Sequence, residues 1–279
     1  QASPTISNIP STATICENQS YTYTVTASGN PSPTYQWHKD LSAIASATTP
    51  SLNITSATTA DDGNYYCKAT NTCGSDSTSI SSLTIDEIPD ITNQSPDQVV
   101  CESQSVTFSI TAIGTTPISY QWYDQSGAIN GATNNTYTIS NVSTSDAGYF
   151  YCKATNSCGS DQSNNINLTV NEGPDITSHT GNTSKCENTS MTFSVTSNGT
   201  TPLSYQWYNS SGAINGAQSS THTINPVTTS DDGNYYCIVT NTCGSDQTNN
   251  IDLTVDEAPS ISTQSSNTTR LEGLQEENA

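Results

Sequence analysis

The chain has 279 residues, of which 31% are hydrophobic and 11% charged, and its formal net charge is −20. Its five Lys and Arg residues can neutralise few phosphates, which argues against nucleic-acid partners and docking on anionic membranes. Nothing resembles a transmembrane span or a signal peptide, and the runs of residues typical of long helices are absent. The composition favours alternating strands, which bury only every second side chain, under an acidic surface that keeps the chain in solution.

An 85-residue repeat organises the chain, and it is marked by one tryptophan and three cysteines in each copy. The tryptophans are Trp37, Trp122 and Trp207, each 30 residues before the middle cysteine of its copy. The period predicts three domains, at 1–85, 86–170 and 171–255. The tail, 256–279, continues the pattern, with Leu271 where the next cysteine would fall, and predicts the first strand of an incomplete fourth repeat.

The middle cysteines of the three copies are Cys67, Cys152 and Cys237. The segment before them reads Asp-x-Gly-x-Tyr-x-Cys in the outer copies, and Phe replaces Tyr in the middle copy. This pattern resembles the immunoglobulin superfamily, in which a strand-C tryptophan packs near a strand-F cysteine between two sheets. The resemblance implies an all-β fold of three tandem immunoglobulin-like sandwiches in an elongated rod. It also implies that the core includes the three tryptophans and the residues two before these cysteines, which are Tyr65, Phe150 and Tyr235.

The middle repeat shows the expected strands most clearly, because its apolar residues alternate. Strands are predicted at 89–92, 98–102, 105–114, 119–123, 136–142, 149–156 and 163–170. Two glycine-marked turns fall between 126 and 133. Short strands joined by turns in this way are what a sandwich requires.

Two departures from the family pattern have consequences. The strand-B cysteine is replaced by Val25, Ile110 and Val195, so we expect Cys67, Cys152 and Cys237 to be buried free thiols. Phe150 replaces the corner tyrosine of the middle domain and has no hydroxyl to bond the backbone. The corner should therefore be weaker there, by about 1 kcal/mol, the size of one hydrogen bond.

Six cysteines remain, one before strand B and one in the turn after strand F of each domain. In the fold that the resemblance implies, these lie at opposite ends of a sandwich, so Cys16 and Cys73 should be roughly 30 Å apart at ~3.3 Å per residue. A disulfide needs Cα atoms within about 7 Å. We therefore favour interdomain disulfides, Cys16 with Cys158 and Cys101 with Cys243. The alternatives are pairs within a domain, and reduced thiols.

This pairing leaves Cys73 in the first domain and Cys186 in the third, which could join successive molecules head to tail. The three-cysteine arrangement, with Cys-Glu before strand B and then Tyr-x-Cys and Asn-x-Cys-Gly, resembles tandem repeats of secreted and surface proteins of bacteria, of the Bacteroidetes kind. The resemblance spans about 255 residues and implies an extracellular setting and an oxidising compartment.

No catalytic or metal-binding motif is present, so we expect neither an enzyme nor a cofactor. The three histidines, His38, His179 and His222, fall at unrelated repeat positions without metal-ligand spacing, and we expect them at the surface. Acidic residues near the domain junctions, such as Asp86, Glu172 and Asp256, could hold calcium, but no spaced ligand loop is present and solvated linkers are the simpler expectation.

Sequons for N-linked glycosylation are frequent in this Ser- and Thr-rich chain, and chance accounts for nearly as many. The candidate residues are Asn18, Asn53, Asn134, Asn141, Asn167, Asn188, Asn198 and Asn209. A glycan on such a chain would shield it from proteases.

The sequence thus predicts a structural subunit of an extracellular filament or surface appendage, used for adhesion or matrix. Its main partner would be another copy of itself, with surface glycans or cells as further partners, and without membrane insertion. The alternatives are a spacer or binding module of a larger adhesin and, because no row of exposed aromatic residues is evident, less readily a carbohydrate-binding accessory of a secreted enzyme.

Overall fold

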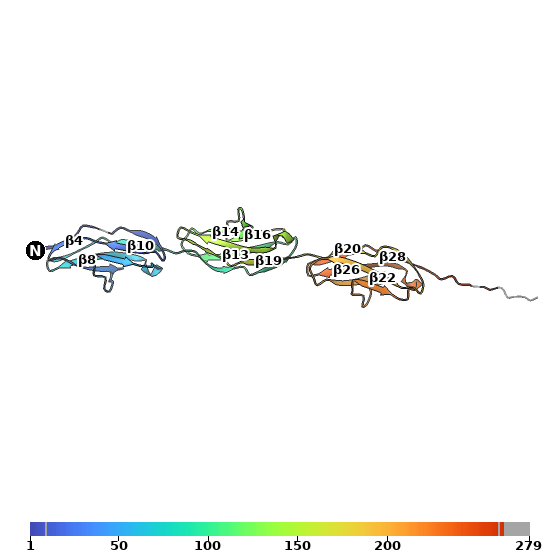
Figure 1. Ribbon diagram of the computed structural model, residues 1–279. Coiled ribbons are helices and arrows are strands. Elements are labelled where there is room, and N and C mark those ends of the chain that lie inside the picture. The colour runs from blue at the N-terminus through green and yellow to red at the C-terminus, as the bar shows by residue number, and fades with distance from the viewer. Residues whose placement is uncertain (9, 262, 265–279) are drawn as a thin grey trace, which may run out of the picture. The chain divides into compact units, whose positions relative to one another are not determined.

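The computed structural model describes residues 1–8, 10–261, 263 and 264, and within these the chain is built from strands (Figure 1). The described residues contain no α-helix, and three single 3-10 turns, η1 (Thr59–Asp61), η2 (Thr144–Asp146) and η3 (Thr229–Asp231), precede the same strand of each repeat. The chain forms two compact units, Gln1–Val170 and Asn171–Ala279, of which the first contains two sandwiches.

In the first sandwich, one layer consists of two strand pairs. Its strands are β1 (Ala2–Ile6), β3 (Tyr21–Thr24), β4 (Ala27–Asn30) and β7 (Ser51–Ile54). The strands of the facing sheet are β2 (Ala13–Cys16), β5 (Thr34–Lys39), β6 (Ser42–Ala43), β8 (Gly63–Asn71), β9 (Gly74–Ser77) and β10 (Ser81–Asp86). They pair in the order β2-β10-β8-β5-β6, with β9 also on β8. The β2–β10 pair is parallel, so the first strand of the fold splits between the two layers.

The middle sandwich repeats this plan, except that one continuous strand, β13, corresponds to β3 and β4 of the first sandwich. One sheet has the order β11-β13-β16, formed by β11 (Asp90–Gln94), β13 (Val106–Ile113) and β16 (Thr136–Ile139). The other is formed by β12 (Gln98–Cys101), β14 (Ser119–Asp124), β15 (Gly127–Ala128), β17 (Gly148–Thr155), β18 (Ser160–Gln162) and β19 (Ile166–Asn171). Its order is β12-β19-β17-β14-β15, with β18 on β17.

The third sandwich has the same arrangement. One sheet is β20-β22-β25, formed by β20 (Asp175–His179), β22 (Met191–Asn198) and β25 (Thr221–Ile224). The other is formed by β21 (Thr183–Cys186), β23 (Ser204–Asn209), β24 (Gly212–Ala213), β26 (Gly233–Asn241), β27 (Gly244–Gln247) and β28 (Ile251–Asp256). Its order is β21-β28-β26-β23-β24, with β27 on β26.

Two strands of the middle repeat are shorter than the alternation predicts. The predicted strand at 136–142 ends at Ile139, and the predicted strand at 163–170 begins only at Ile166, as β19, after a loop that separates it from β18. In this loop the Ser163 hydroxyl accepts a hydrogen bond from the buried Cys152 amide at 2.9 Å. Side-chain hydrogen bonds of this kind compete with strand pairing.

Each sandwich has its own core, and a fully buried tryptophan lies in each. Trp37, Trp122 and Trp207 are 0% exposed and lie opposite the middle cysteine of their repeat across the C–F strand pair. Their indole Nε1 atoms donate hydrogen bonds to backbone carbonyls at 2.9–3.0 Å, so the buried donor is satisfied. The residues in place of the family's strand-B cysteine, Val25, Ile110 and Val195, are also buried.

The predicted fourth-repeat strand is not present in the described part of the tail. Residues 257–261, 263 and 264 form no strand. Leu271, which marks the continued period, lies outside the described residues, as does the rest of the tail.

Candidate functional site

A disulfide joins the first and second sandwiches within the first unit. The Sγ atoms of Cys16 and Cys158 are 1.99 Å apart, and their Cα atoms are 5.3 Å apart. Cys16 ends β2 of the first sandwich, and Cys158 lies in the turn between β17 and β18 of the second. The bond closes a loop between residues 142 apart in sequence, and cross-links over long loops restrict the unfolded chain most.

The glutamate after Cys16 contacts the linker between these two sandwiches. The Glu17 amide donates a hydrogen bond to the Asp86 carbonyl at 2.9 Å. Its carboxylate Oε1 accepts one from the Ile88 amide, also at 2.9 Å. The Cys-Glu pair therefore holds the linker from the side of the first sandwich, by both backbone and side chain.

Asn156 holds the same linker from the side of the second sandwich. Its Nδ2 donates to the Glu87 carbonyl at 2.7 Å and to the Thr115 carbonyl at 2.8 Å. Its Oδ1 accepts from the amides of Cys158 at 2.9 Å and Gly159 at 3.2 Å. One amide side chain thus fixes both the linker and the turn that carries Cys158, which places the thiol for its partner.

Ile88 packs closely against this turn. A Cβ added at Gly159 would be 3.1 Å from Ile88 Cγ2, so a larger residue would push the linker outward. Gly114 has φ +131°, and a Cβ there would be 2.9 Å from the Ile88 carbonyl. Glycine is required at this second position both by the backbone conformation and by the close approach.

The third sandwich repeats the clamp on the linker that enters it. Asn241 Nδ2 donates to the carbonyls of Glu172 at 2.8 Å and Thr200 at 2.9 Å. Its Oδ1 accepts from the Cys243 amide at 2.8 Å. By repeat register Cys243 corresponds to Cys158, and its amide donates to Asn241 as the Cys158 amide donates to Asn156.

The first sandwich carries the clamp at its own Asn-x-Cys turn. Asn71 Nδ2 donates to the Ala2 carbonyl at 2.9 Å and to the Pro31 carbonyl at 2.8 Å, and its Oδ1 accepts from the Cys73 amide at 2.8 Å. Ala2 takes the place that Glu87 and Glu172 take in the other copies. The Cys73 thiol is free and partly exposed, and lies 3.4 Å from Oε1 of Gln1.

In the third sandwich, Cys186 has the position that Cys16 has in the first. It ends β21, which pairs in parallel with β28 as β2 pairs with β10. The following Glu187 amide donates to the Asp256 carbonyl at 3.0 Å, the counterpart of the Glu17 bond. The Cys186 thiol is free and exposed.

The three thiols expected to be buried and free, Cys67, Cys152 and Cys237, are all 0% exposed and unpaired. Burial raises the pKa of each to about 11. A protonated thiol without access to solvent is a poor nucleophile, so these cysteines act as small apolar core residues.

The corner tyrosines differ between the sandwiches. The Tyr65 hydroxyl donates to the Asp61 carbonyl at 2.7 Å, and the Tyr235 hydroxyl donates to the Asp231 carbonyl at 2.9 Å. Phe150 is 5% exposed at the equivalent place and packs on Phe108 with ring centroids 4.7 Å apart. The middle corner therefore lacks this tyrosine-to-carbonyl hydrogen bond.

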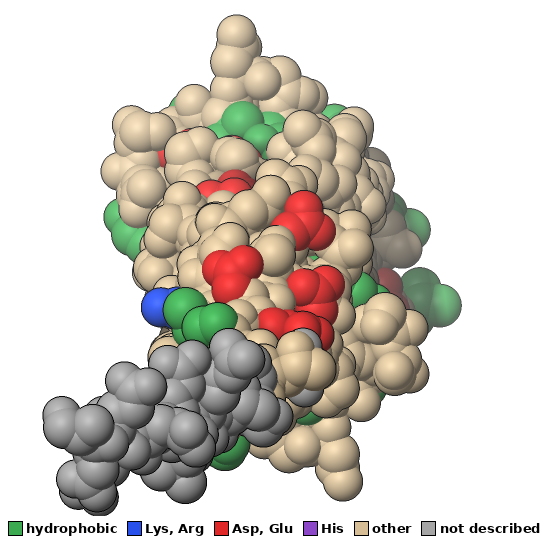
Figure 2. Space-filling model, turned by 90° about the vertical axis from the view of Figure 1, so that its right-hand side faces the viewer, with side chains coloured by type: hydrophobic (Ala, Val, Ile, Leu, Met, Phe, Trp, Pro, Cys, Tyr) green, Lys and Arg blue, Asp and Glu red, His purple; other side chains and the backbone are tan. Residues whose placement is uncertain are grey.

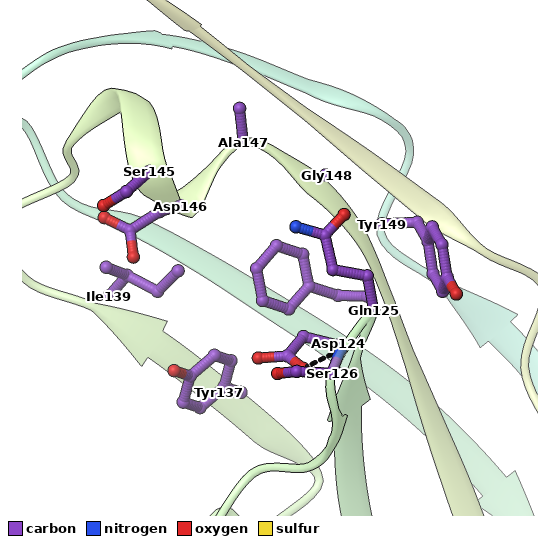
Figure 3. A pocket seen from close by; sticks show the side chains of 11 residues that line it. Asp124, Gln125, Ser126, Tyr137, Ile139, Ser145, Asp146, Ala147, Gly148 and Tyr149 are labelled. Carbon is purple, nitrogen blue, oxygen red and sulfur yellow. Dashed lines mark hydrogen bonds between the residues drawn. The ribbon is translucent and has the colours of Figure 1, made fainter.

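A hollow of about 160 Å³ adjoins Phe150 (Figure 3). The Asp124 carboxylate on its wall accepts hydrogen bonds from the hydroxyl and amide of Ser126, and the first of these lowers its pKa most. The Asp146 carboxylate accepts from the amide and hydroxyl of Ser143 at 2.8 and 2.7 Å. Both carboxylates are engaged in holding turns, which does not suit general acid–base work.

Sequence reasoning missed a pair of stacked aromatic rings on the outer face of each sandwich. Tyr123 stacks on Tyr151, and Tyr208 on Tyr236, with centroids 4.9 Å apart and planes 2° apart in each pair. In the first sandwich His38 stacks on Tyr66 at 4.6 Å. The sequence signal was a Tyr next to the buried Trp on one strand and another next to the buried Cys on the neighbouring strand. These two residues are recognised as a cross-strand pair only when the register of the two strands is known.

The three histidines are half-buried instead of lying freely at the surface. His222 replaces Tyr137 beside the core, and burial lowers its pKa. His179 Nδ1 lies 2.8 Å from the Thr180 carbonyl. Among the residues that the structure describes, no group of three His, Cys, Asp or Glu side chains is placed to hold a metal ion.

Acidic side chains gather on the face that Figure 2 presents, whereas basic ones are sparse there, in keeping with 25 acidic and five basic residues in the chain. Seven of the candidate glycosylation residues are exposed, and Asn209 is half-buried. The seven are Asn18, Asn53, Asn134, Asn141, Asn167, Asn188 and Asn198. Over the described part of the chain, no helix is long and apolar enough to span a bilayer.

Comparison with known families matches the description "Immunoglobulin domain" at three places in the chain. The matched residues are 3–71, 89–170 and 173–241, one stretch in each repeat. Among solved structures, a three-domain I-band fragment of titin is similar with a TM-score of 0.70 and 21% identity, over 92% of this chain and 99% of the fragment. The eight N-terminal domains of Down Syndrome Cell Adhesion Molecule give a TM-score of 0.61 at 20% identity, over 91% of this chain and 36% of that one. At such identities these structures show the fold alone.

Similar sequences include animal adhesion proteins. Roundabout homolog 1 of Mus musculus is 30% identical over 56% of this chain and 11% of its own length. Cell adhesion molecule DSCAM of Gallus gallus is 28% identical over 84% and 13%, and Hemicentin-1 of Homo sapiens is 27% identical over 92% and 5%.

The chain thus spans a small part of each of these relatives. Because they come from animals, they lend no support to a bacterial source. None of them is named as an enzyme, and the chain is similar in sequence to these adhesion proteins. With an immunoglobulin-domain match in every repeat and the same sandwich built three times, the chain belongs to the immunoglobulin superfamily.

Proposed function

We propose that the chain is a structural module of an extracellular filament or surface appendage, in which sandwiches are joined end to end by disulfides. The observation that carries this proposal is the Cys16–Cys158 bond between the first two sandwiches. It joins the Cys-Glu end of one repeat to the Asn-x-Cys turn of the next, and both ends recur in every copy. A covalent joint resists separation under tension in a way that a noncovalent interface does not.

The same pairing applied one repeat later joins Cys101 to Cys243. Cys101 ends β12 as Cys16 ends β2, and Cys243 is presented by Asn241 as Cys158 is by Asn156. Neither Cys101 nor Cys243 is among the free thiols. We therefore propose this second bond from the repeat register and from the equivalent turns.

Cys73 and Cys186 are the unused members of the same pattern, and we propose that they join successive modules head to tail. Cys73 has the turn of Cys158, and Cys186 has the strand end of Cys16. Bond formation removes two protons and two electrons from the two thiols, and a small disulfide in an oxidising extracellular compartment accepts them and leaves as two small thiols. The product is a polymer of this chain, which adheres to cells or glycans through its surface.

Complementary single variants test the polarity of this linkage. In a glutathione redox buffer the native chain should give a ladder on a non-reducing gel, and reductant should collapse the ladder to one band. Cys73→Ser alone and Cys186→Ser alone should remain monomeric, whereas their mixture should give a dimer that grows no further, because serine occupies both of its ends. A dimer from either variant alone would show symmetric pairing and would contradict a head-to-tail filament.

A second candidate is a spacer within a larger adhesin, because the chain covers only 5–13% of the long relatives DSCAM and Hemicentin-1. In that case Cys73 and Cys186 pair with neighbouring repeats of one polypeptide. Reduced material from the native source separates the two readings, because the isolated chain carries the same two thiols in either case. The reduced subunit of a filament is a short chain of a few repeats, whereas a spacer remains part of one long polypeptide.

A further inference from the structure

A second surface of the first sandwich is built unlike its counterparts. A hollow of about 340 Å³ is lined by Asp40, Leu41, Asn64, Tyr66 and Ile80. The Leu41 side chain is 79% exposed and Ile80 is 60% exposed, although they lie on different loops of the same sheet. Two large aliphatic side chains thus flank one recess in a chain whose surface is otherwise rich in Ser, Thr, Asn and Asp.

The other two sandwiches carry polar residues at these positions and supply an internal control. Leu41 corresponds to Ser126 and Ser211, Ile80 to Asn165 and Asn250, and Asp40 to Gln125 and Ser210, all at the 85-residue period. The polar counterparts of the two aliphatic residues are exposed in the same sheets. The fold therefore does not need an aliphatic residue at either position.

The backbone of Leu41 makes its presence harder to explain by folding. Asp40 has φ +47° and Leu41 has φ +74°, because they form the tight turn between β5 and β6. Glycine, asparagine and aspartate suit this conformation, and a branched apolar residue does not. An exposed leucine in a left-handed turn gains neither burial nor backbone relief, which indicates that its side chain serves a contact.

The base of the hollow is firm and its rim is acidic. Tyr66 lies on β8 and is stacked on His38 with planes 7° apart, so the ring is fixed from behind. Asp40 Oδ1 accepts a hydrogen bond from the Asn64 amide at 2.9 Å, which holds the carboxylate beside the recess. A rigid apolar recess next to a fixed negative charge suits an apolar side chain that is followed by a cationic one.

We propose that this hollow, formed by Leu41, Tyr66, Ile80 and the Asp40 carboxylate, docks a cationic partner protein through an aliphatic or aromatic side chain flanked by Lys or Arg. Charge favours this partner, because the Asp40 carboxylate beside the recess and the net charge of −20 both attract a basic protein. The site goes beyond the filament, since it lies on the side of a sandwich and uses no cysteine.

Two defined peptides test the proposal on the full chain with Cys73 and Cys186 both changed to Ser, so that polymer formation plays no part. The probes are fluorescein-labelled Lys-Lys-Leu-Phe-Lys-Lys and Glu-Glu-Leu-Phe-Glu-Glu, followed by fluorescence anisotropy. We expect the basic peptide to bind and the acidic one not to bind. Leu41→Ser with Ile80→Asn, the residues of the third sandwich, should weaken binding at least about tenfold, because anchor contacts dominate such interfaces.

Further variants separate the apolar from the electrostatic part. Asp40→Ser should weaken binding and flatten its dependence on salt, while Ser211→Ala in the third sandwich should leave binding unchanged. Equal binding by the native chain and the Leu41→Ser, Ile80→Asn chain would overturn the site. So would failure of the basic peptide to bind, or sedimentation showing that the hollow instead pairs two copies of the chain.

Discussion

The first and middle sandwiches are built on one 85-residue pattern, yet they differ at three places on their periphery. The Asn-x-Cys turn carries a disulfide in the middle sandwich and a free thiol in the first. The corner residue is Phe150 in the middle sandwich and Tyr65 in the first. Beside the β5–β6 hairpin of the first sandwich, Leu41 and Ile80 flank a recess, whereas the equivalent residues of the middle sandwich are polar.

The comparison shows which parts of the repeat are free to change. Trp37 and Trp122 are equally buried, and they pair across the sheet with Cys67 and Cys152 in the same register. This central Trp–Cys pair is constant, because a change there affects packing on both sheets, whereas other core positions vary, as Tyr23 does from Phe108. Individual roles are assigned to turns and strand ends, where a substitution alters a contact without disturbing the core.

The largest effect is expected from removing the closed joint. Cys16→Ser with Cys158→Ser should lower the free energy of unfolding of the first unit by about 2–4 kcal/mol, because the long loop is no longer restricted in the unfolded chain. Urea unfolding followed by tryptophan fluorescence measures this. Cys73→Ser, at the equivalent turn without a bond, is the matched control and should not change the midpoint. An unchanged midpoint in the double variant would mean that the bond contributes nothing to stability.

We expect the asparagine of the Asn-x-Cys turn to contribute more to the free energy of unfolding at the disulfide-linked joint (Asn156) than in the first sandwich (Asn71). Asn156→Ala removes four hydrogen bonds that hold both linker and turn, and we expect a loss of about 2 kcal/mol after water replaces some of them. Asn71→Ala removes three hydrogen bonds, with Ala2, Pro31 and Cys73, but none of them holds a linker between two described sandwiches, and the change should cost about 1 kcal/mol. The same unfolding assay compares the two variants. A larger loss for Asn71→Ala than for Asn156→Ala would show that the hydrogen bonds to the linker are not the main contribution of this side chain.

The corner difference can be reversed in both directions. Phe150→Tyr should add the hydrogen bond to the Asp146 carbonyl and raise the stability of the middle sandwich by about 1 kcal/mol. Tyr65→Phe should lower that of the first sandwich by a similar amount. Differential scanning calorimetry on both variants measures the pair. A destabilised Phe150→Tyr variant would indicate that the stack on Phe108 outweighs the missing bond.

The smallest effect is expected in the dependence on alkaline pH. Burial raises the pKa of the Cys67 and Cys152 thiols from 9.0 to about 11, and burial also raises the pKa of Tyr65. The folded chain keeps these protons while the unfolded chain loses them. Their contribution is therefore complete below about pH 9 and declines as the pH rises toward 11.

The corner variants again provide the control for this dependence. Tyr65→Phe should make the alkaline decline of the first sandwich shallower, because one of the buried groups that keep their proton is then removed. Phe150→Tyr should make that of the middle sandwich steeper. Unfolding midpoints at intervals from pH 8 to pH 11 would reveal the slopes, and identical slopes in all three proteins would exclude the tyrosine as a source.

Much of the fold could be predicted, because repeat spacing and alternation are properties of the sequence. The period located the three repeats, the resemblance to the immunoglobulin superfamily placed Trp122 and Cys152 in the core, and the splitting of the first strand followed from two short apolar runs before strand B. The end of β16 at Ile139 and the loop at Ser163 could not be predicted. Ser163 bonds with Cys152, and Val142, beyond the end of β16, bonds with the backbone of Gln104, and neither partner is marked by alternation.

Contacts between loops lay further beyond reach. Leu41 and Ile80 border one recess only because the turn between β5 and β6 and the loop before β10 meet on the same face. The stack of Tyr123 on Tyr151 depends on the register of β14 and β17, which alternation alone does not determine. The position of Cys16 could be predicted from the fold that the sequence resembles, but the hydrogen bonds of Glu17 and Asn156 to the linker could not.

The most direct test of end-to-end linkage is to map the disulfide-linked peptides of the native chain by mass spectrometry after digestion without reductant. The account predicts peptides that join Cys16 to Cys158 and Cys101 to Cys243, and, in material that has polymerised, a peptide that joins Cys73 to Cys186. A peptide joining Cys16 to Cys73 within one sandwich would contradict it, because the two ends of a repeat would then close on themselves instead of on their neighbours.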